Sequence, residues 1–156
     1  MKKLVIACAA AAAFCLPGAA MAQSGSGPET VFQCTLANGK TVRVTAQGGN
    51  LFYTYGRGRR AELSLRGSPR SGNVHYMQQR YASIQSQLRF TNGAHHYIVH
   101  SMGRSVVADS SAISGLVVMR GNRRVADHSC RRFTEFRGGF DTLRAMPEDS
   151  EAYSVM

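Results

Sequence analysis

The sequence of 156 residues has no Trp, four Cys and only nine Asp and Glu, against 19 Lys and Arg. Four Cys are too few for a disulfide-dense scaffold, and beyond the N-terminal segment no apolar run is long enough for a membrane-spanning helix. The scarcity of acids leaves few carboxylates for general acid–base chemistry and gives a formal net charge of +10. Hydrophobic residues make up 44% of the chain, which is enough for one domain with a core.

The first 22 residues have the three parts of a secretory signal peptide. Two lysines precede an almost wholly apolar stretch over residues 4–16, and Ala20-Met21-Ala22 provides the small residues that a signal peptidase reads. We therefore predict that residues 1–22 are removed and that the mature protein is periplasmic or secreted. Residues 23–30 are small and polar, which is typical of a flexible leader.

Two cysteines, Cys34 and Cys130, remain after this cleavage. In an oxidising compartment their simplest interpretation is one disulfide, with two free thiols or an intermolecular bridge as the alternatives. The bond would close a long loop, a constraint of roughly 4 to 5 kcal/mol in the chain-entropy model. Two distant thiols without other soft ligands do not indicate a metal site, and we predict no cofactor.

Short stretches of alternating apolar and polar residues, separated by turn signals, continue to Arg132 and indicate a β domain over residues 31–136. Asn38-Gly39 and Asn92-Gly93 are hairpin signals, because both residue types tolerate a positive φ. We predict an all-β domain of about eight strands, a small antiparallel barrel or sandwich closed by one disulfide.

Three segments fit this pattern less clearly. Residues 74–87 are compatible either with a strand and a loop or with a short helix. Val106-Val107 are predicted to form a strand. The acidic residues near the C-terminus indicate that residues 137–156 form a mobile tail.

Catalytic motifs are absent from the sequence. It has no nucleophile elbow, no His-Glu-x-x-His and no phosphate-binding glycine loop. His96 and His100 share a strand face but lie roughly 13 Å apart, too far for one metal ion. We expect a binding protein rather than an enzyme. The alternative is a hydrolase assembled from loop serines, for which Ser110, Ser111 and Ser114 are candidates.

Positive charge is concentrated at turns, and Lys40 is the only Lys after residue 22. Guanidinium forks suit phosphate and carboxylate groups, so these clusters predict binding of anionic envelope components such as lipopolysaccharide phosphates or acidic glycans. Solvated turns that keep strand edges apart are the alternative. The aromatic residues occupy core-like positions, which argues against a nucleic-acid stacking platform. The clusters are Arg57, Arg59 and Arg60; Arg120, Arg123 and Arg124; and Arg131 and Arg132. The first two are the candidate binding clusters.

Short motifs follow one another in a recognisable order over residues 31–132. An aromatic-x-Cys strand leads into an Asn-Gly-Lys turn and a Val-x-Val strand, and a Ser-Gly pair precedes an Arg-Gly turn and a closing Cys. They are Phe32-Gln33-Cys34, Asn38-Gly39-Lys40, Val42-Arg43-Val44, Ser114-Gly115, Arg120-Gly121 and Cys130.

This order resembles the small periplasmic lysozyme inhibitors of Gram-negative bacteria, which are exported, disulfide-linked antiparallel β-barrels of about eight strands. The resemblance implies inhibition of a peptidoglycan-cleaving enzyme. It also implies that Ser114 and Gly115 form the loop that enters the enzyme cleft, with Arg120, Arg123 and Arg124 as neighbouring anchors.

Overall fold

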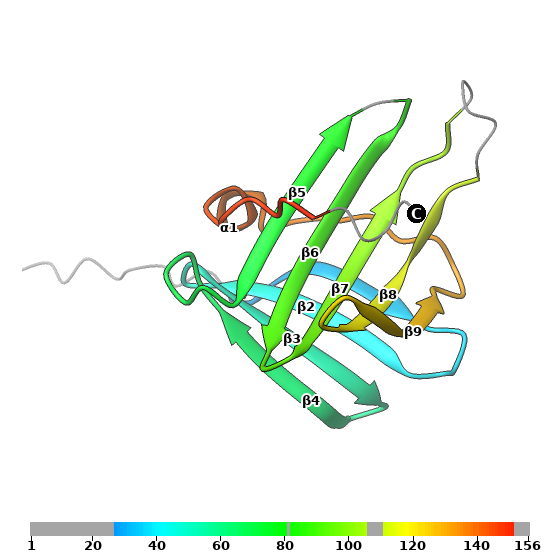
Figure 1. Cartoon of the computed structure of the whole chain (residues 1–156), viewed down its shortest axis with the longest axis horizontal. Helices are drawn as coiled ribbons and strands as arrows, with labels where there is room; N and C mark the ends of the chain where they lie inside the picture. The colour runs from blue at the N-terminus through cyan, green and yellow to red at the C-terminus, as the bar shows by residue number, and fades with distance from the viewer. Residues whose placement is uncertain (1–26, 81, 106–110, 152–156) are drawn as a thin grey trace, which may run out of the picture.

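The computed structural model describes residues 27–80, 82–105 and 111–151. Within these ranges, nine strands form two antiparallel sheets (Figure 1). The four-stranded sheet contains, in spatial order, β1 (Glu29–Thr35), β2 (Thr41–Gln47), β3 (Asn50–Arg57) and β4 (Arg60–Gly67). The five-stranded sheet contains β5 (Val74–Arg80), β6 (Ile84–Asn92), β7 (His95–Met102), β8 (Ile113–Arg120) and β9 (Arg123–Ser129). One short helix, α1 (Phe140–Arg144), follows.

The structure confirms the all-β prediction. Hairpins form at both predicted places: Asn38-Gly39 lie in the turn between β1 and β2, and Gly93 with Ala94 connects β6, which ends at Asn92, to β7. The two sheets are not closed into a barrel, so the sandwich alternative holds. The segment 74–87, which the sequence left open, forms β5 and the start of β6. The predicted Val106-Val107 strand and the predicted signal peptide lie outside the described residues.

The core lies between the two sheets because their inner faces carry the apolar residues of each alternation. Val42 and Val44 from β2 and Leu88 from β6 are completely buried. The ring of Tyr53 lies 5.4 Å from that of Phe90, which belongs to the other sheet. Full burial of each such side chain contributes about 1.5–3 kcal/mol.

The predicted disulfide between Cys34 and Cys130 is present and joins residues 96 positions apart. It links β1 of one sheet to the residue that follows β9 of the other. Main-chain hydrogen bonds reinforce this corner: the N–H of Arg131 donates to the carbonyl of Thr35 at 2.8 Å. The first and last strands therefore hold the two sheets together at one end.

The prediction of a mobile tail over residues 137–156 is wrong for residues 137–151. Leu143 is completely buried and Met146 is 6% exposed, so α1 and the turn after it pack against the core. The chain then runs along the edge strand β5. The N–H of Tyr76 donates to the Pro147 carbonyl at 2.9 Å, and the N–H of Asp149 donates to the Tyr76 carbonyl at 3.0 Å.

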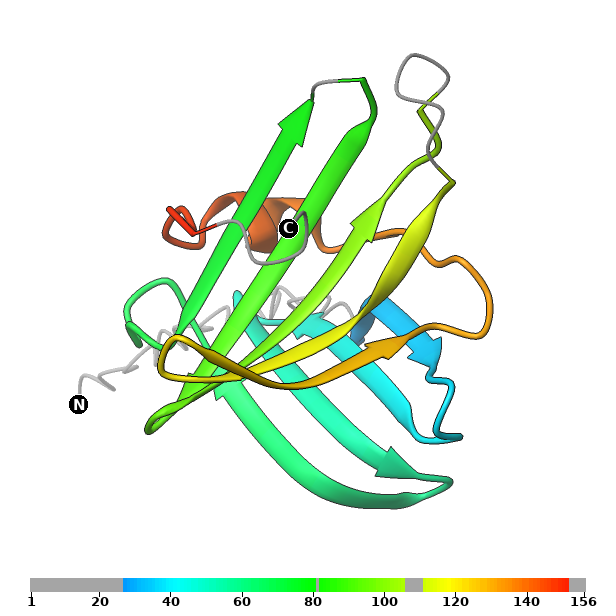
Figure 2. The same cartoon turned by 45° about the vertical axis from the view of Figure 1, so that its right-hand side comes forward.

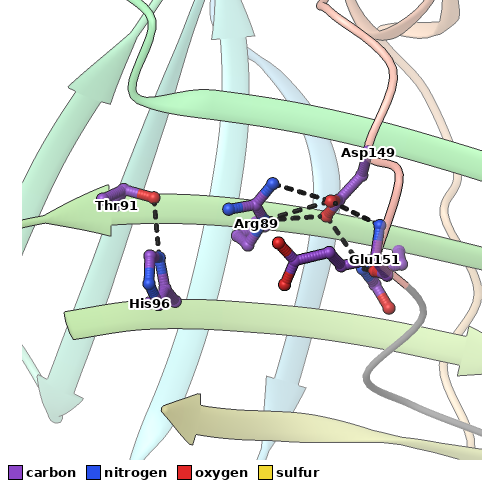
Figure 3. Close-up of polar contacts among 6 residues, drawn as sticks. Arg89, Thr91, His96, Asp149 and Glu151 are labelled. Atoms are coloured by element: carbon purple, nitrogen blue, oxygen red, sulfur yellow. Dashed lines mark hydrogen bonds and ion pairs between the residues drawn. The ribbon is translucent and has the colours of Figure 1, made fainter. Parts of the chain in front are cut away.

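A buried ion pair attaches this C-terminal segment to the outer face of the five-stranded sheet (Figure 3). Asp149 accepts hydrogen bonds from Nε and Nη2 of Arg89 on β6. The side-chain amide of Gln87 donates to Asp149 at 2.8 Å and to the Glu151 carbonyl at 2.6 Å. The acidic pattern suggested solvated carboxylates, whereas Asp149 has a cationic partner far away in sequence.

Candidate functional site

The turn between β3 and β4 carries the first predicted arginine cluster. Arg57 and Arg60 are cross-strand partners, so Gly58 and Arg59 form a two-residue turn between them. Gly58 has a φ of 58°, a left-handed conformation that favours glycine. All three predicted arginines of this turn are exposed.

A shallow depression of about 350 Å³ lies beside this turn. Three arginines and two threonines contribute to its lining, and no carboxylate does. We call it the arginine depression. It is lined by Thr41, Arg43, Thr54, Tyr55, Gly56, Gly58, Arg59, Arg60 and Ala61.

Two local features of the strands shape the arginine depression. Arg43 lies between the buried residues Val42 and Val44, so the alternation of β2 directs its side chain outward. A register irregularity follows Tyr55, where β4 approaches closely. An ideal Cβ on Gly56 would lie 2.1 Å from the carbonyl oxygen of Arg60, so only glycine fits this approach.

Two further guanidinium groups meet at the neighbouring β1–β2 turn. Arg57 donates from Nη2 to the carbonyl of Asn38 at 3.2 Å. An ideal Cβ on Gly39 would lie 3.3 Å from Nη1 of Arg57 and 3.7 Å from Nη2 of Arg131. Both guanidinium groups therefore lie close to one point above the turn. Arg131 reaches this place because the preceding residue, Cys130, is held by the disulfide.

Within the described residues, none of these arginines forms an ion pair with a carboxylate. The four ion pairs found there are Lys40–Glu62, Arg89–Asp149, Arg124–Asp127 and Arg144–Asp141. In particular, Glu62 is engaged by Lys40, whose pKa is raised by this hydrogen bond. The arginine depression and the pair above Gly39 thus form a positive surface that no described carboxylate neutralises.

The second predicted cluster lies elsewhere. Arg120, Arg123 and Arg124 surround the β8–β9 turn, where the N–H of Gly121 donates to the Ala94 carbonyl at 2.9 Å. Arg124 is paired with Asp127 at 2.9 Å. This turn and the β3–β4 turn lie on opposite sides of the molecule (Figure 2). The structure therefore does not unite the two clusters.

Ser114 and Gly115 do not form the loop that the resemblance implies. Both lie inside β8, and Ser114 is 5% exposed. The Ser114 hydroxyl accepts a hydrogen bond from the N–H of Thr134 at 3.0 Å. An ideal Cβ on Gly115 would lie 2.4 Å from the His128 carbonyl oxygen. A partner cannot reach these residues without opening the sheet, so their role is structural.

Two residues of the candidate site, Arg43 and Arg131, are not among the binding residues that the sequence predicted. Arg43 was read only as the middle of a Val-x-Val strand, although its outward position already followed from the alternation. The sequence could not place Arg131 beside Gly39, because this proximity depends on the packing of β1 against the end of β9.

The titratable groups on the outer face of the five-stranded sheet show no metal site. Burial lowers the pKa of His100 and that of His75. The positive charge of Arg89 lowers the pKa of His75 further. Both imidazoles are therefore neutral near pH 7. Within the described residues, no three His, Cys, Asp or Glu side chains are placed to hold a metal ion.

The fold and the site define a class: a disulfide-linked antiparallel β-sandwich with an arginine-lined depression at one turn. Comparison with protein-family models, with curated proteins and with solved structures finds no match to this chain. In the described part of the chain, the single helix is too short to cross a membrane.

Proposed function

We propose that the chain is an exported, non-catalytic binding module that binds anionic groups of the cell envelope, such as lipopolysaccharide phosphates or acidic glycans. The observation that carries the proposal is the lining of the arginine depression. Arg43, Arg59 and Arg60 line it together with two threonines, and its lining contains no carboxylate.

The chemistry of this lining suits phosphate, sulfate and carboxylate groups. A guanidinium presents paired N–H donors that match two oxygens of such an anion, and a hydroxyl adds a further donor. Arg57 and Arg131 extend the positive surface beyond the depression, which favours a ligand with several charges over a single ion. Because these side chains are exposed, binding will weaken as salt screens the charges.

Export is supported by two features. The signal-peptide pattern of residues 1–22 predicts secretion. The Cys34–Cys130 disulfide fits the oxidising compartments in which such bonds persist. Envelope phosphates and acidic glycans are the anions that a protein meets there.

Retention on a polyanion tests the proposal. The chain from residue 23 is passed over immobilised lipopolysaccharide and over an acidic glycan, and the salt concentration that elutes it is measured. We expect steep salt dependence and loss of retention when Arg43, Arg59 and Arg60 are all replaced by Glu.

The matched control reverses the same number of charges at the β8–β9 turn, by replacing Arg120, Arg123 and Arg124 with Glu. This variant is expected to remain bound. Equal loss of retention in both variants would mean that net charge alone drives adsorption, and retention that ignores salt would also contradict the proposal.

Inhibition of a peptidoglycan-cleaving enzyme is a second proposal, supported by the order of motifs over residues 31–132 and by the disulfide. Since Ser114 and Gly115 are buried, the exposed Arg120 and Arg123 of the β8–β9 turn are the remaining contacts on this side. A panel of c-, g- and i-type lysozymes tests it. Absence of inhibition and of binding across the panel at micromolar protein would remove the proposal.

A further inference from the structure

The inner face of the five-stranded sheet changes from apolar to polar along its length. In one cross-strand row, four side chains belong to the core: Tyr76, Leu88, Val99 and Leu116. The neighbouring row on the same face lies two residues away on every strand, toward the end of β5 and β7 and the start of β6 and β8. It consists of one amide and three hydroxyls. These are Gln78, Ser86, Ser101 and Ser114, here called the polar row.

The three serines of the polar row are buried, whereas Gln78 on the edge strand β5 is exposed. Ser86 is 3% exposed and Ser101 is 5% exposed. The Ser86 hydroxyl accepts a hydrogen bond from the Gln78 amide at 3.1 Å and also bonds to the Tyr76 hydroxyl. A buried row of hydroxyls stabilises a sheet less than apolar side chains would, because polar groups lose hydration there.

A cavity of about 460 Å³ opens over three members of the polar row. Its sides are formed by the end of β5, the start of β6, the end of β7, and the chain from Glu135 to the first residue of α1. These strand ends lie away from the β3–β4 turn (Figure 1). Its volume lies within the range of small-molecule sites. It is lined by Gln78, Ser83, Ile84, Ser86, Ser101, Gly103, Arg104, Glu135, Phe136 and Phe140.

The side walls of the cavity are aromatic and aliphatic. The ring of Phe136 is fixed by Phe32 and Tyr76, whose ring centroids lie 5.2 and 6.1 Å away. Phe140 is 41% exposed and Ile84 is 49% exposed, and both line this one cavity. A ligand in the cavity would cover apolar surface that the fold itself leaves open.

We propose that this cavity binds a neutral, hydroxyl-rich ring, that is, a saccharide unit. Amide and hydroxyl groups both donate and accept hydrogen bonds, as do the hydroxyls of a sugar. Aromatic rings offer flat apolar surfaces to the C–H face of a sugar ring. The lining contains one cation, Arg104, and one anion, Glu135, so it favours no net ligand charge. The site is separate from the arginine depression and does not rest on its function.

Nuclear magnetic resonance titration of the isotope-labelled chain from residue 23 tests the proposal. The probes are a panel of neutral mono- and disaccharides with gluco, galacto, manno and N-acetylglucosamine configurations. We expect amide shifts confined to the cavity lining, Gln78, Ser86, Ser101 and Arg104 among them. No shifts with any sugar at about 50 mM would overturn the proposal.

Two phenylalanines of nearly equal exposure provide a matched pair of variants. Phe140→Ala removes a wall of the cavity and is expected to weaken sugar binding roughly fivefold. Phe133, which is 39% exposed and does not line the cavity, provides the control, and Phe133→Ala is expected to leave affinity unchanged. Equal effects in both variants would contradict the site.

Two more measurements separate the explanations. Cyclohexanol presents an apolar ring with one hydroxyl, and shifts as strong as those of the sugars would show an apolar pocket rather than a saccharide site. The variant with Glu at Arg43, Arg59 and Arg60 is expected to bind sugar normally. The anion-binding function can thus fail while the saccharide site stands, and the reverse also holds.

Discussion

Asp149 and Arg89, 60 residues apart, form a two-pronged ion pair with oxygen–nitrogen distances of 2.7 to 3.1 Å. The Asp149 side chain is fully buried and that of Arg89 is 11% exposed. Such a pair costs desolvation energy and is retained only with good geometry. The pair therefore fixes the position of residue 149, near the end of the described residues, on the interior strand β6.

Replacing Asp149 with Asn is expected to lower the free energy of unfolding by about 3 kcal/mol, because a buried guanidinium loses its carboxylate partner. Urea denaturation followed by circular dichroism measures the change. Asp141→Asn is the control, since the Asp141–Arg144 pair is exposed and its removal is expected to leave the midpoint unchanged. Similar midpoints for both variants would contradict a stabilising role of the buried pair.

Removing the disulfide with the double replacement of Cys34 and Cys130 by Ala is expected to lower the free energy of unfolding by about 4 to 5 kcal/mol. The effect follows from the 96-residue separation of the two cysteines, which the bond restricts in the unfolded chain. Denaturation with and without reductant checks it. Reductant should shift the unfolding midpoint of the unmodified chain and leave that of the variant in place; a reductant-insensitive native chain would refute the prediction.

Acid is expected to destabilise the fold through His100. Burial lowers its pKa below 6.5, while Asp127 opposes this shift and Arg124 adds to it. Below about pH 6.5 the His100 side chain takes up a proton more readily in the unfolded chain than in the folded chain. The free energy of unfolding therefore decreases as the pH is lowered. Denaturation at several pH values measures this slope, which should flatten in His100→Gln. His95→Gln, at the half-exposed start of β7, is the control. An unaltered slope in His100→Gln would exclude His100 as the source.

Ser114→Ala is expected to lower the free energy of unfolding by about 1–2 kcal/mol, because the buried N–H of Thr134 loses its acceptor. Thermal unfolding compares it with Ser129→Ala, which alters an exposed position of β9. Polyanion retention should be the same in both variants. A selective loss of partner binding in folded Ser114→Ala would restore a contact role for this residue.

Local sequence signals predicted much of the fold. Asn-Gly pairs located two hairpins, and strict alternation identified the inward residues of β2 and β3. The β5–β6 hairpin was harder to predict because polar residues interrupt the apolar face there: Ser86 is buried, and Gln78 opposite it is exposed. Those residues belong to the polar row, so the feature that weakened the pattern is also what distinguishes the cavity.

Contacts between distant segments account for the remaining differences. The proximity of Arg131 to Gly39 depends on the disulfide corner, and the position of Asp149 depends on a partner in β6. Neither relationship has a local signature, because charge and turn preferences say nothing about which remote segment lies opposite. The prediction of a contact loop at Ser114 came from the Ser-Gly motif. The apolar alternation that includes Leu116 instead indicates a strand, and Ser114 lies in β8.

The main-chain bonds between Tyr76 and residues 147 and 149 protect the backbone of an edge strand. A copy clipped or terminated before Pro147 would expose the N–H and C=O groups of Tyr76 as a template for pairing with another molecule. Intact and shortened copies should thus differ in their tendency to self-associate. Proteolytic loss of the segment from Pro147 onward would increase the oligomeric state of the protein.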